Sequence, residues 1–393
     1  MLIPTGISVV FFSQIQFSIF LLCLLWLNFL FLDYPPKTLS NQKNSFTMTA
    51  NRINRDILKQ QLAAETFSRT TISFYKYFDI EDPISFRNQI YDEWNELNCF
   101  GRIYVAHEGI NAQMSVPSHH LETFLTLLYS IPELTNTPIK YAVEDNGKSF
   151  YKLTIKVRPY IVADGLPSKS YDLSNVGTHL SAIDFHQAVQ NPNAIVVDMR
   201  NHYESEIGRF ENAYCPDSDT FKEAIIDVVE KFKDEKDKEF LLYCTGGIRC
   251  EKASAYLIHN GFENVSQLHG GIIEYAQQIK KLNLSSKFIG KNFVFDERLA
   301  ESIDGQVIAH CHQCGKPADT HTNCANNDCH LLFIQCDDCK KQYNGCCSHE
   351  CAQIITLPAD ERLKIRQTNA AKYAMSQIYR SRRAKARSEK SSD

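Results

Sequence analysis

Hydrophobic and polar positions follow two periods along residues 69–165. Runs rich in aromatic and β-branched residues, at 71–78, 102–106, 110–116, 139–143 and 152–162, have the pattern of strands. Residues 83–97 and 117–128 carry apolar side chains three and four positions apart, which predicts two helices. The order strand, helix, strand, strand, helix, strand, with one further strand, predicts an α+β sandwich of the ferredoxin-like or acylphosphatase-like type.

A different pattern occupies residues 173–285. Residues 194–198 and 240–243 are short, continuously apolar runs, as expected of strands buried on both faces. Residues 179–189 and 251–260 have helical spacing. Alternating strands and helices predict a doubly wound α/β domain, in which ligands bind at the carboxyl edge of the sheet.

Cysteine dominates the segment from 290 to 357. Nine of the chain's 14 cysteines lie between Cys311 and Cys351, mostly in closely spaced pairs. Such thiolates supply the tetrahedral ligands of structural zinc, and a segment with little apolar core would gain folding energy from the metal. Disulfides and an iron–sulfur cluster are the alternatives. The ligands we predict, enough for one or two zinc ions, are Cys311, Cys314, Cys324, Cys329, Cys336, Cys339, Cys346 and Cys351. Either Cys346 or its neighbour Cys347 is expected to be surplus.

The two ends of the chain have unusual compositions. Residues 1–47 are an apolar appendage, in which 7–32 are long and apolar enough to cross a membrane. No Lys or Arg precedes Lys37, so the positive region of a secretory signal is missing. We therefore expect translation to begin near Met48; the alternative is a membrane or signal segment, and only then a membrane partner. Residues 358–393 have helical spacing that gives way to a basic, helical or disordered tail.

Charge is almost balanced, at a formal −4, so a basic surface must be local. Lys152, Lys156 and Arg158 alternate along one predicted strand and share a face. Further basic residues, Arg382, Arg383 and Arg387 among them, lie in the tail. Each group is either a solvated surface or a contact for a phosphate backbone.

The strongest chemical signal is the loop that begins at Cys244. An apolar strand runs into Cys244-Thr-Gly-Gly-Ile-Arg249, and a helical pattern follows. A helix N-terminus, inward-pointing backbone N–H groups and a guanidinium all favour a thiolate over a thiol. We predict that Cys244 is a nucleophile, in a cradle formed by Thr245, Gly246, Gly247, Ile248 and Arg249. The alternative is a buried structural cysteine.

Spacing distinguishes two classes of such loops. A cysteine-dependent phosphatase needs its arginine six positions after the cysteine, and that position holds Cys250. Three charged residues, Asp198, Arg200 and Glu204, follow the neighbouring strand at the same predicted sheet edge. They either support the cysteine or form an ion-pair network that holds their own loop.

The Cys-x-x-Gly-x-Arg spacing resembles the rhodanese domain. Together with His107-Glu-Gly-Ile-Asn-Ala112 in the first domain and Gly345-Cys-Cys-Ser348 in the last, it makes the chain similar, from about Ser73 to Leu357, to the bacterial rhodanese-like tRNA uridine hydroxylases. The resemblance implies oxygen-dependent 5-hydroxylation of the wobble uridine, position 34, with tRNA as partner and molecular oxygen as co-substrate. It also implies that Cys244 is the active-site cysteine and carries a persulfide.

Two other functions fit the same residues. One is a rhodanese-type sulfurtransferase that moves persulfide sulfur from a donor to a thiol or to RNA. The other is a zinc-containing RNA-binding scaffold without activity. The sequence has no nucleotide or flavin motif, and its reactive and clustered cysteines predict a cytoplasmic protein.

Overall fold

The computed structural model describes residues 54–167, 170–329, 331–368 and 380–381. The appendage at 1–47, with its apolar stretch at 7–32, lies outside these ranges, as do Arg382, Arg383 and Arg387. None of the helices within the ranges has the length and apolar character that a membrane span needs. A short helix, α2 (Arg55–Ala63), precedes the first domain.

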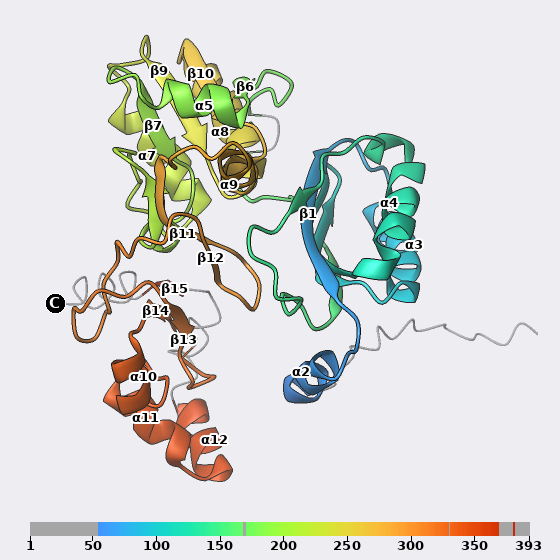
Figure 1. Cartoon of the computed structure of the whole chain (residues 1–393), viewed down its shortest axis with the longest axis vertical. Helices are drawn as coiled ribbons and strands as arrows, with labels where there is room; N and C mark the ends of the chain where they lie inside the picture. Colours follow the sequence, from blue (N-terminus) through green and yellow to red (C-terminus); the bar gives the residue numbers. More distant parts are fainter. Residues whose placement is uncertain (1–53, 168–169, 330, 369–379, 382–393) are drawn as a thin grey trace, which may run out of the picture. The chain divides into compact units, whose positions relative to one another are not determined.

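The first domain is a five-stranded sheet with two helices packed on one face (Figure 1). The strands are β1 (Arg69–Tyr77), β2 (Phe100–Ala106), β3 (Gly109–Pro117), β4 (Lys140–Tyr141) and β5 (Leu153–Val157), and the helices are α3 (Pro83–Glu96) and α4 (Leu121–Ser130). The strand order is β4-β1-β3-β2-β5, with β5 parallel to β2. This arrangement confirms the acylphosphatase-like fold.

The two faces of this sheet differ because side chains alternate along each strand. Phe74 and Met114 point to the helices and pack with Trp94 of α3 in a fully buried core. Asn111 and Gln113 of β3 have the opposite parity and are only half-buried. The sheet therefore has one apolar face under its helices and one polar face away from them.

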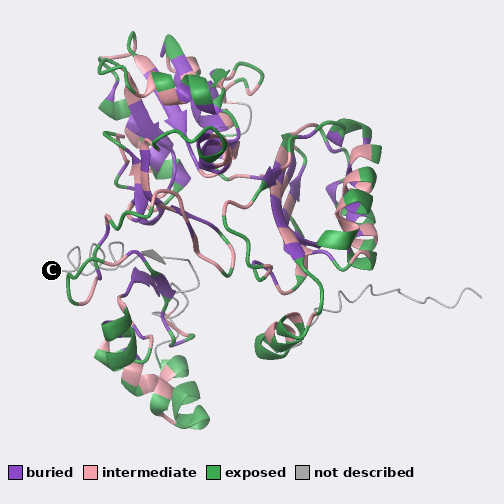
Figure 2. Cartoon of the chain, in the orientation of Figure 1, coloured by how far each residue is buried: buried purple, intermediate pink, exposed green. Residues whose placement is uncertain are grey.

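The second domain is a four-stranded parallel sheet with helices on both faces. Its strands are β6 (Thr178–Leu180), β7 (Ile195–Asp198), β9 (Glu239–Tyr243) and β10 (Asn264–Leu268), in the order β6-β10-β9-β7. One buried cluster joins the sheet to α5 (Ala182–Ala188) and α9 (Gly271–Lys281), and another joins it to α7 (Phe221–Lys231) and α8 (Ile248–His259). The prediction of a doubly wound domain is thus confirmed, and its central strands β7 and β9 are buried along almost their whole length (Figure 2).

Smaller elements complete the chain. After α6 (His202–Ser205), β8 (Gly208–Phe210) pairs with β11 (Phe288–Phe293), and β11 pairs with β12 (Ala300–Ser302). The cysteine-rich segment contains β13 (His321–Asn323), β14 (Leu331–Ile334), α10 (Asp337–Gln342) and α11 (His349–Thr356). Beyond it lie α12 (Ala359–Thr368) and the two-residue strand β15 (Arg380–Ser381), which pairs with β14. One of the buried clusters in the cysteine-rich segment consists largely of cysteines, so this cluster packs little apolar surface.

Candidate functional site

The Cys244 loop joins the end of β9 to the start of α8. Gly247 has φ of 96°, a left-handed conformation that glycine adopts without strain, and it directly precedes the first residue of the helix. Its N–H donates to Cys244 Sγ at 3.1 Å. A Cβ on Gly247 would lie 2.9 Å from Tyr75 Oη, so glycine is also needed for a close approach of the first domain.

The environment of Cys244 favours its thiolate. Burial raises the pKa, but hydrogen bonding from the Cys250 thiol, the charge of Arg249 and the backbone N–H groups of Arg249 and Gly247 lower it to about 6. Burial and the neighbouring Cys244 raise the pKa of Cys250 well above its ordinary value. Cys244 is therefore the anionic member of this pair and Cys250 the neutral donor.

Arg249 is bound by a carboxylate from the neighbouring loop. Its Nη1 and Nη2 donate to Glu204 Oε1 and Oε2 at 2.6 and 2.8 Å, and both side chains are buried. Glu204 belongs to α6, which follows β7, and β7 is the parallel neighbour of β9. The structure thus brings Glu204 to the cysteine loop, as expected from the shared sheet edge.

Asp198 and Arg200 form a second buried ion pair. Arg200 Nη2 donates to Asp198 Oδ2 and to the Gly208 carbonyl, each at 2.6 Å. Neither side chain lines the cavity described below. Their arrangement matches the alternative interpretation, a network that holds its own loop.

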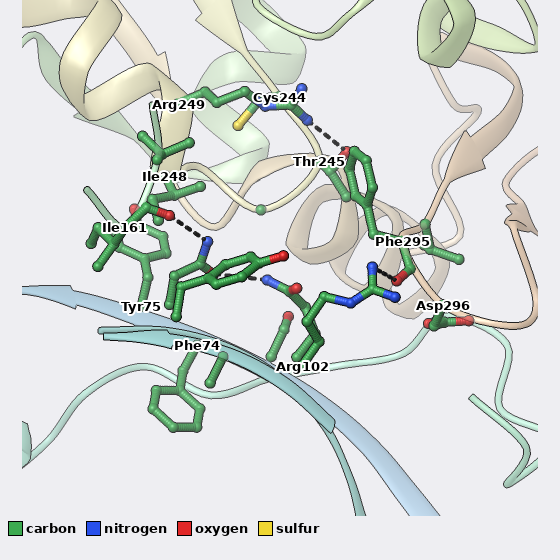
Figure 3. A pocket seen from close by; sticks show the side chains of 18 of the residues that line it. Phe74, Tyr75, Arg102, Ile161, Cys244, Thr245, Ile248, Arg249, Phe295 and Asp296 are labelled. Carbon is green, nitrogen blue, oxygen red and sulfur yellow. Dashed lines mark hydrogen bonds between the residues drawn. The ribbon is translucent and has the colours of Figure 1, made fainter. Parts of the chain in front are cut away.

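A cavity of about 650 Å³ lies between the first domain and the cysteine loop (Figure 3). Cys244, Thr245, Gly246, Ile248 and Arg249 line it from the second domain. Strands β1, β2 and β3 line it with their polar face, and Phe295 and Asp296 lie at its side. The residues of the first domain that line it from this face include Ser73, Tyr75, Arg102, Tyr104, Asn111 and Gln113.

Lys140 is a cavity residue that the sequence did not single out. It is buried, its stem passes Gly246 and Gly270, and its Nζ lies 4.6 Å from the centroid of the Tyr75 ring. Burial lowers the pKa of Lys140 to about 8, against the opposing charges of Cys244, Glu274 and Glu251. No local pattern marks this lysine, because β4 has only two residues.

Polar contacts join the first domain to helix α8. Tyr75 Oη donates to Glu251 Oε1 at 2.8 Å, and Tyr77 Oη donates to the Ile248 carbonyl at 3.3 Å. Lys252 Nζ lies 2.9 Å from Glu108 Oε2. Glu108, part of the His107-Glu-Gly-Ile-Asn-Ala112 motif, thus holds the helix that carries Arg249. Tyr75 lies in the Phe74-Tyr-Lys-Tyr77 stretch, which did not predict a role for it in the site.

The basic residues predicted to contact RNA are separated by the structure. Arg158 lines the cavity, with its guanidinium carbon 6.0 Å from the Tyr104 ring centroid. Lys152 and Lys156 are exposed and do not line it, and only Lys156 lies within β5. Arg102 on β2 lines the cavity as well, and the sequence did not reveal it.

Eight cysteines form two groups of four. Within each group the sulfur atoms all lie within 4.8 Å of one another. Cys311, Cys314, Cys336 and Cys339 make the first, and Cys324, Cys329, Cys347 and Cys351 make the second. These groups are consistent with metal binding.

Cys346 does not belong to the second group, contrary to our expectation, and Cys347 takes its place. Cys347 Sγ is 3.7 Å from Cys329 Sγ and 3.8 Å from Cys351 Sγ. The Cys346 side chain packs in the buried cluster with Leu331 and Phe333. Only one of two adjacent side chains reaches the group, and the spacing alone did not show which.

Cys244 is buried between a parallel strand and a helix, its surroundings favour the thiolate, and an arginine follows five positions later. These features define a rhodanese-type domain. In this chain it is joined to an acylphosphatase-like domain. Residues 181–278 match the rhodanese-like domain family, 69–161 the UPF0176 acylphosphatase like domain and 289–352 the rhodanase C-terminal family. All three matches agree with the fold.

Proteins named tRNA uridine(34) hydroxylase are similar over most of the chain. The protein from Photorhabdus laumondii is 54% identical over 79% of this chain and 89% of its own length. The protein from Escherichia fergusonii is 53% identical over 80% of this chain and 91% of its own length. The protein from Yersinia enterocolitica is 53% identical over 79% of this chain and 89% of its own length. The chain belongs to the tRNA uridine(34) hydroxylase family, which confirms the resemblance drawn from its motifs.

Proposed function

We propose that this protein hydroxylates uridine 34 of tRNA at C5, in an oxygen-dependent reaction, with the base bound in the cavity beside Cys244. The observation that carries the proposal is the cavity itself, which has one wall from the rhodanese domain and one from the acylphosphatase-like sheet. Its volume of about 650 Å³ is that of a typical small-molecule site and suits a nucleoside.

Cys244 is the nucleophile in this proposal, as the thiolate or as its persulfide. Its lowered pKa, near 6, keeps it ionised at neutral pH. Thr245 and Gly246 line the cavity beside it, and the Gly247 N–H and the Arg249 charge stabilise the anionic sulfur. Glu204 keeps Arg249 in place.

The tRNA backbone contacts basic residues around the cavity. Arg102 and Arg158 line it from exposed positions, and Lys152 and Lys156 lie on or beside the edge strand β5. Such residues bind phosphates without reading sequence. Because the cysteines must stay reduced, we place the reaction in the cytoplasm.

Structural zinc is the metal that suits the cysteine groups. Four thiolates about 2.3 Å from one zinc ion are about 3.8 Å apart from each other. The sulfur separations of Cys314 from Cys336, of Cys329 from Cys347 and of Cys347 from Cys351 are 3.6, 3.7 and 3.8 Å. The two groups would hold one zinc ion each, and zinc would supply folding energy to a segment poor in apolar core.

Nucleoside mass spectrometry of tRNA tests the function. In a strain that lacks this protein and has no other route to the modification, 5-hydroxyuridine should disappear, and the wild-type protein should restore it. Cys244→Ala should not restore it, whereas the control Cys215→Ala should, since half-buried Cys215 lies outside the cavity lining.

Three outcomes would overturn the proposal. Unchanged 5-hydroxyuridine in the deleted strain would exclude hydroxylation as the function. Loss of a thiolated nucleoside instead would favour sulfur transfer. Full rescue by Cys244→Ala would favour a scaffold.

A further inference from the structure

Strand β3 presents two amide side chains to the cavity, Asn111 and Gln113. Tyr75 of β1 and Tyr104 of β2 lie opposite Asn111 in the sheet register, and Arg102 of β2 lies opposite Gln113. All five residues line the cavity. Proteins bind single-stranded RNA bases by stacking them on aromatic rings, often on a sheet, and by hydrogen bonds to the base edges.

A chain of hydrogen bonds fixes the orientation of both amides. Asn111 Nδ2 donates to the Ile161 carbonyl at 3.2 Å. A carbonyl can only accept, so the Asn111 amide cannot be reversed without losing this bond. Asn111 Oδ1 then accepts from Gln113 Nε2 at 2.7 Å, and for the same reason the Gln113 amide cannot be reversed either.

Gln113 keeps unused hydrogen-bonding capacity beside the cavity. Its Oε1 and the second hydrogen on Nε2 make no hydrogen bond within the part of the chain that the structure describes. An acceptor next to a donor, held in one order, complements the N3–H of uracil and one of its adjacent carbonyl groups.

We infer that Gln113, oriented by Asn111 and the Ile161 carbonyl, is the residue that selects uracil at this site. The inference deepens the proposed function and rests on it. Gln113 Oε1 accepts from uracil N3–H, and Nε2 donates to a neighbouring uracil carbonyl. In cytosine N3 is an acceptor, so the same pose would set two lone pairs against each other, and the fixed amide cannot turn to relieve the repulsion.

The same contact orients the reacting edge of the base. N3 lies across the pyrimidine ring from C6, which is bonded to C5. A base held at N3 by the sheet therefore turns its C5–C6 edge toward the opposite wall, where Cys244 lies. Tyr104 and Tyr75 flank the amides and offer ring surfaces against which the base can pack.

Binding of two anticodon stem-loop RNAs, identical except for uridine or cytidine at position 34, tests the inference with the full chain. Wild type should prefer the uridine RNA. Gln113→Met, which keeps the side chain's length but removes both polar groups, should reduce that preference by about 10- to 100-fold. Gln89→Met, the same change at an exposed position of α3, should leave it unaltered.

Asn111→Leu separates orientation from a merely structural role. It frees the Gln113 amide to turn, so binding of the cytidine RNA should become tighter while binding of the uridine RNA weakens. Loss of folding would weaken both. An unchanged preference in both folded variants, with wild type still forming 5-hydroxyuridine, would overturn this inference alone. A wild type with no preference and no 5-hydroxyuridine would overturn the proposed function and the inference with it.

Discussion

Arg249 and Glu204 form a buried bidentate ion pair, with Nη1 2.6 Å from Oε1 and Nη2 2.8 Å from Oε2. The charge of Arg249 is therefore partly offset by a carboxylate. The thiolate at Cys244 also needs the Cys250 thiol and the backbone N–H groups of Gly247 and Arg249. Arg249 therefore stabilises the anionic sulfur of Cys244 and also binds Glu204, which follows β7.

Glu204→Gln should destabilise the rhodanese domain and make Cys244 more acidic. It leaves a buried guanidinium without its counter-charge, which typically costs about 3–5 kcal/mol. The uncompensated positive charge also favours the thiolate. Denaturant unfolding and the pH dependence of Cys244 alkylation would measure the two effects.

The control for this prediction is Glu230→Gln. Glu230 pairs with Lys233 at 2.6 Å, but both side chains are largely exposed. Such a pair contributes about 0–1 kcal/mol, so the variant should unfold almost as wild type does. Equal stability of the two variants would contradict a stabilising role for Glu204.

Cys244 should react with iodoacetamide at half its maximal rate near pH 6. The thiolate is the nucleophile, and a pKa lowered to about 6 means that its population rises with pH through that value. Cys250, whose pKa is raised, should stay unmodified up to pH 9. Peptide mass spectrometry reports both cysteines in one sample, and half-maximal reaction of Cys244 at pH 8–9 would refute its activation.

The Cys244 loop was predictable because its chemistry lies in consecutive residues. Strand, glycine turn, arginine and helix follow each other within one short stretch, so local pattern and function coincide. The same holds for the order of elements in the first domain, which alternation and helical spacing revealed. Glu204 was found because parallel strands end at one sheet edge.

Other contacts within the site could not be read from the sequence. Lys140 looks like any surface lysine until the fold inserts it beside Gly246 and Gly270, more than 100 residues further along the chain. Asn111 and Tyr75 become neighbours only through the register of β1 and β3. Cys346 and Cys347 are adjacent and chemically identical, so only backbone direction decides which of them joins the cysteine group.

Lys140→Met should make Cys244 less acidic. The substitution removes a buried positive charge near the cysteine loop while keeping an unbranched side chain of similar length. The half-maximal pH of Cys244 alkylation should rise by about one unit. Lys140→Arg should shift it less, because the charge remains, and exposed Lys280→Met on α9 should not shift it. An unchanged profile in Lys140→Met would show that Lys140 does not act on the sulfur.

The two adjacent cysteines, Cys346 and Cys347, give a direct test of the metal sites. Metal analysis of the purified wild type should find two equivalents of zinc, one for each group of four. Cys347→Ala should retain one, because it removes a ligand whose sulfur lies 3.7 Å from Cys329 and 3.8 Å from Cys351. Cys346→Ala should retain two and lose stability only through the packing of its buried side chain. Because zinc bound at these groups would supply folding energy, chelation should unfold the cysteine-rich segment and leave the rhodanese sheet intact. If Cys346→Ala lost the metal and Cys347→Ala kept it, Cys346 rather than Cys347 would be the zinc ligand.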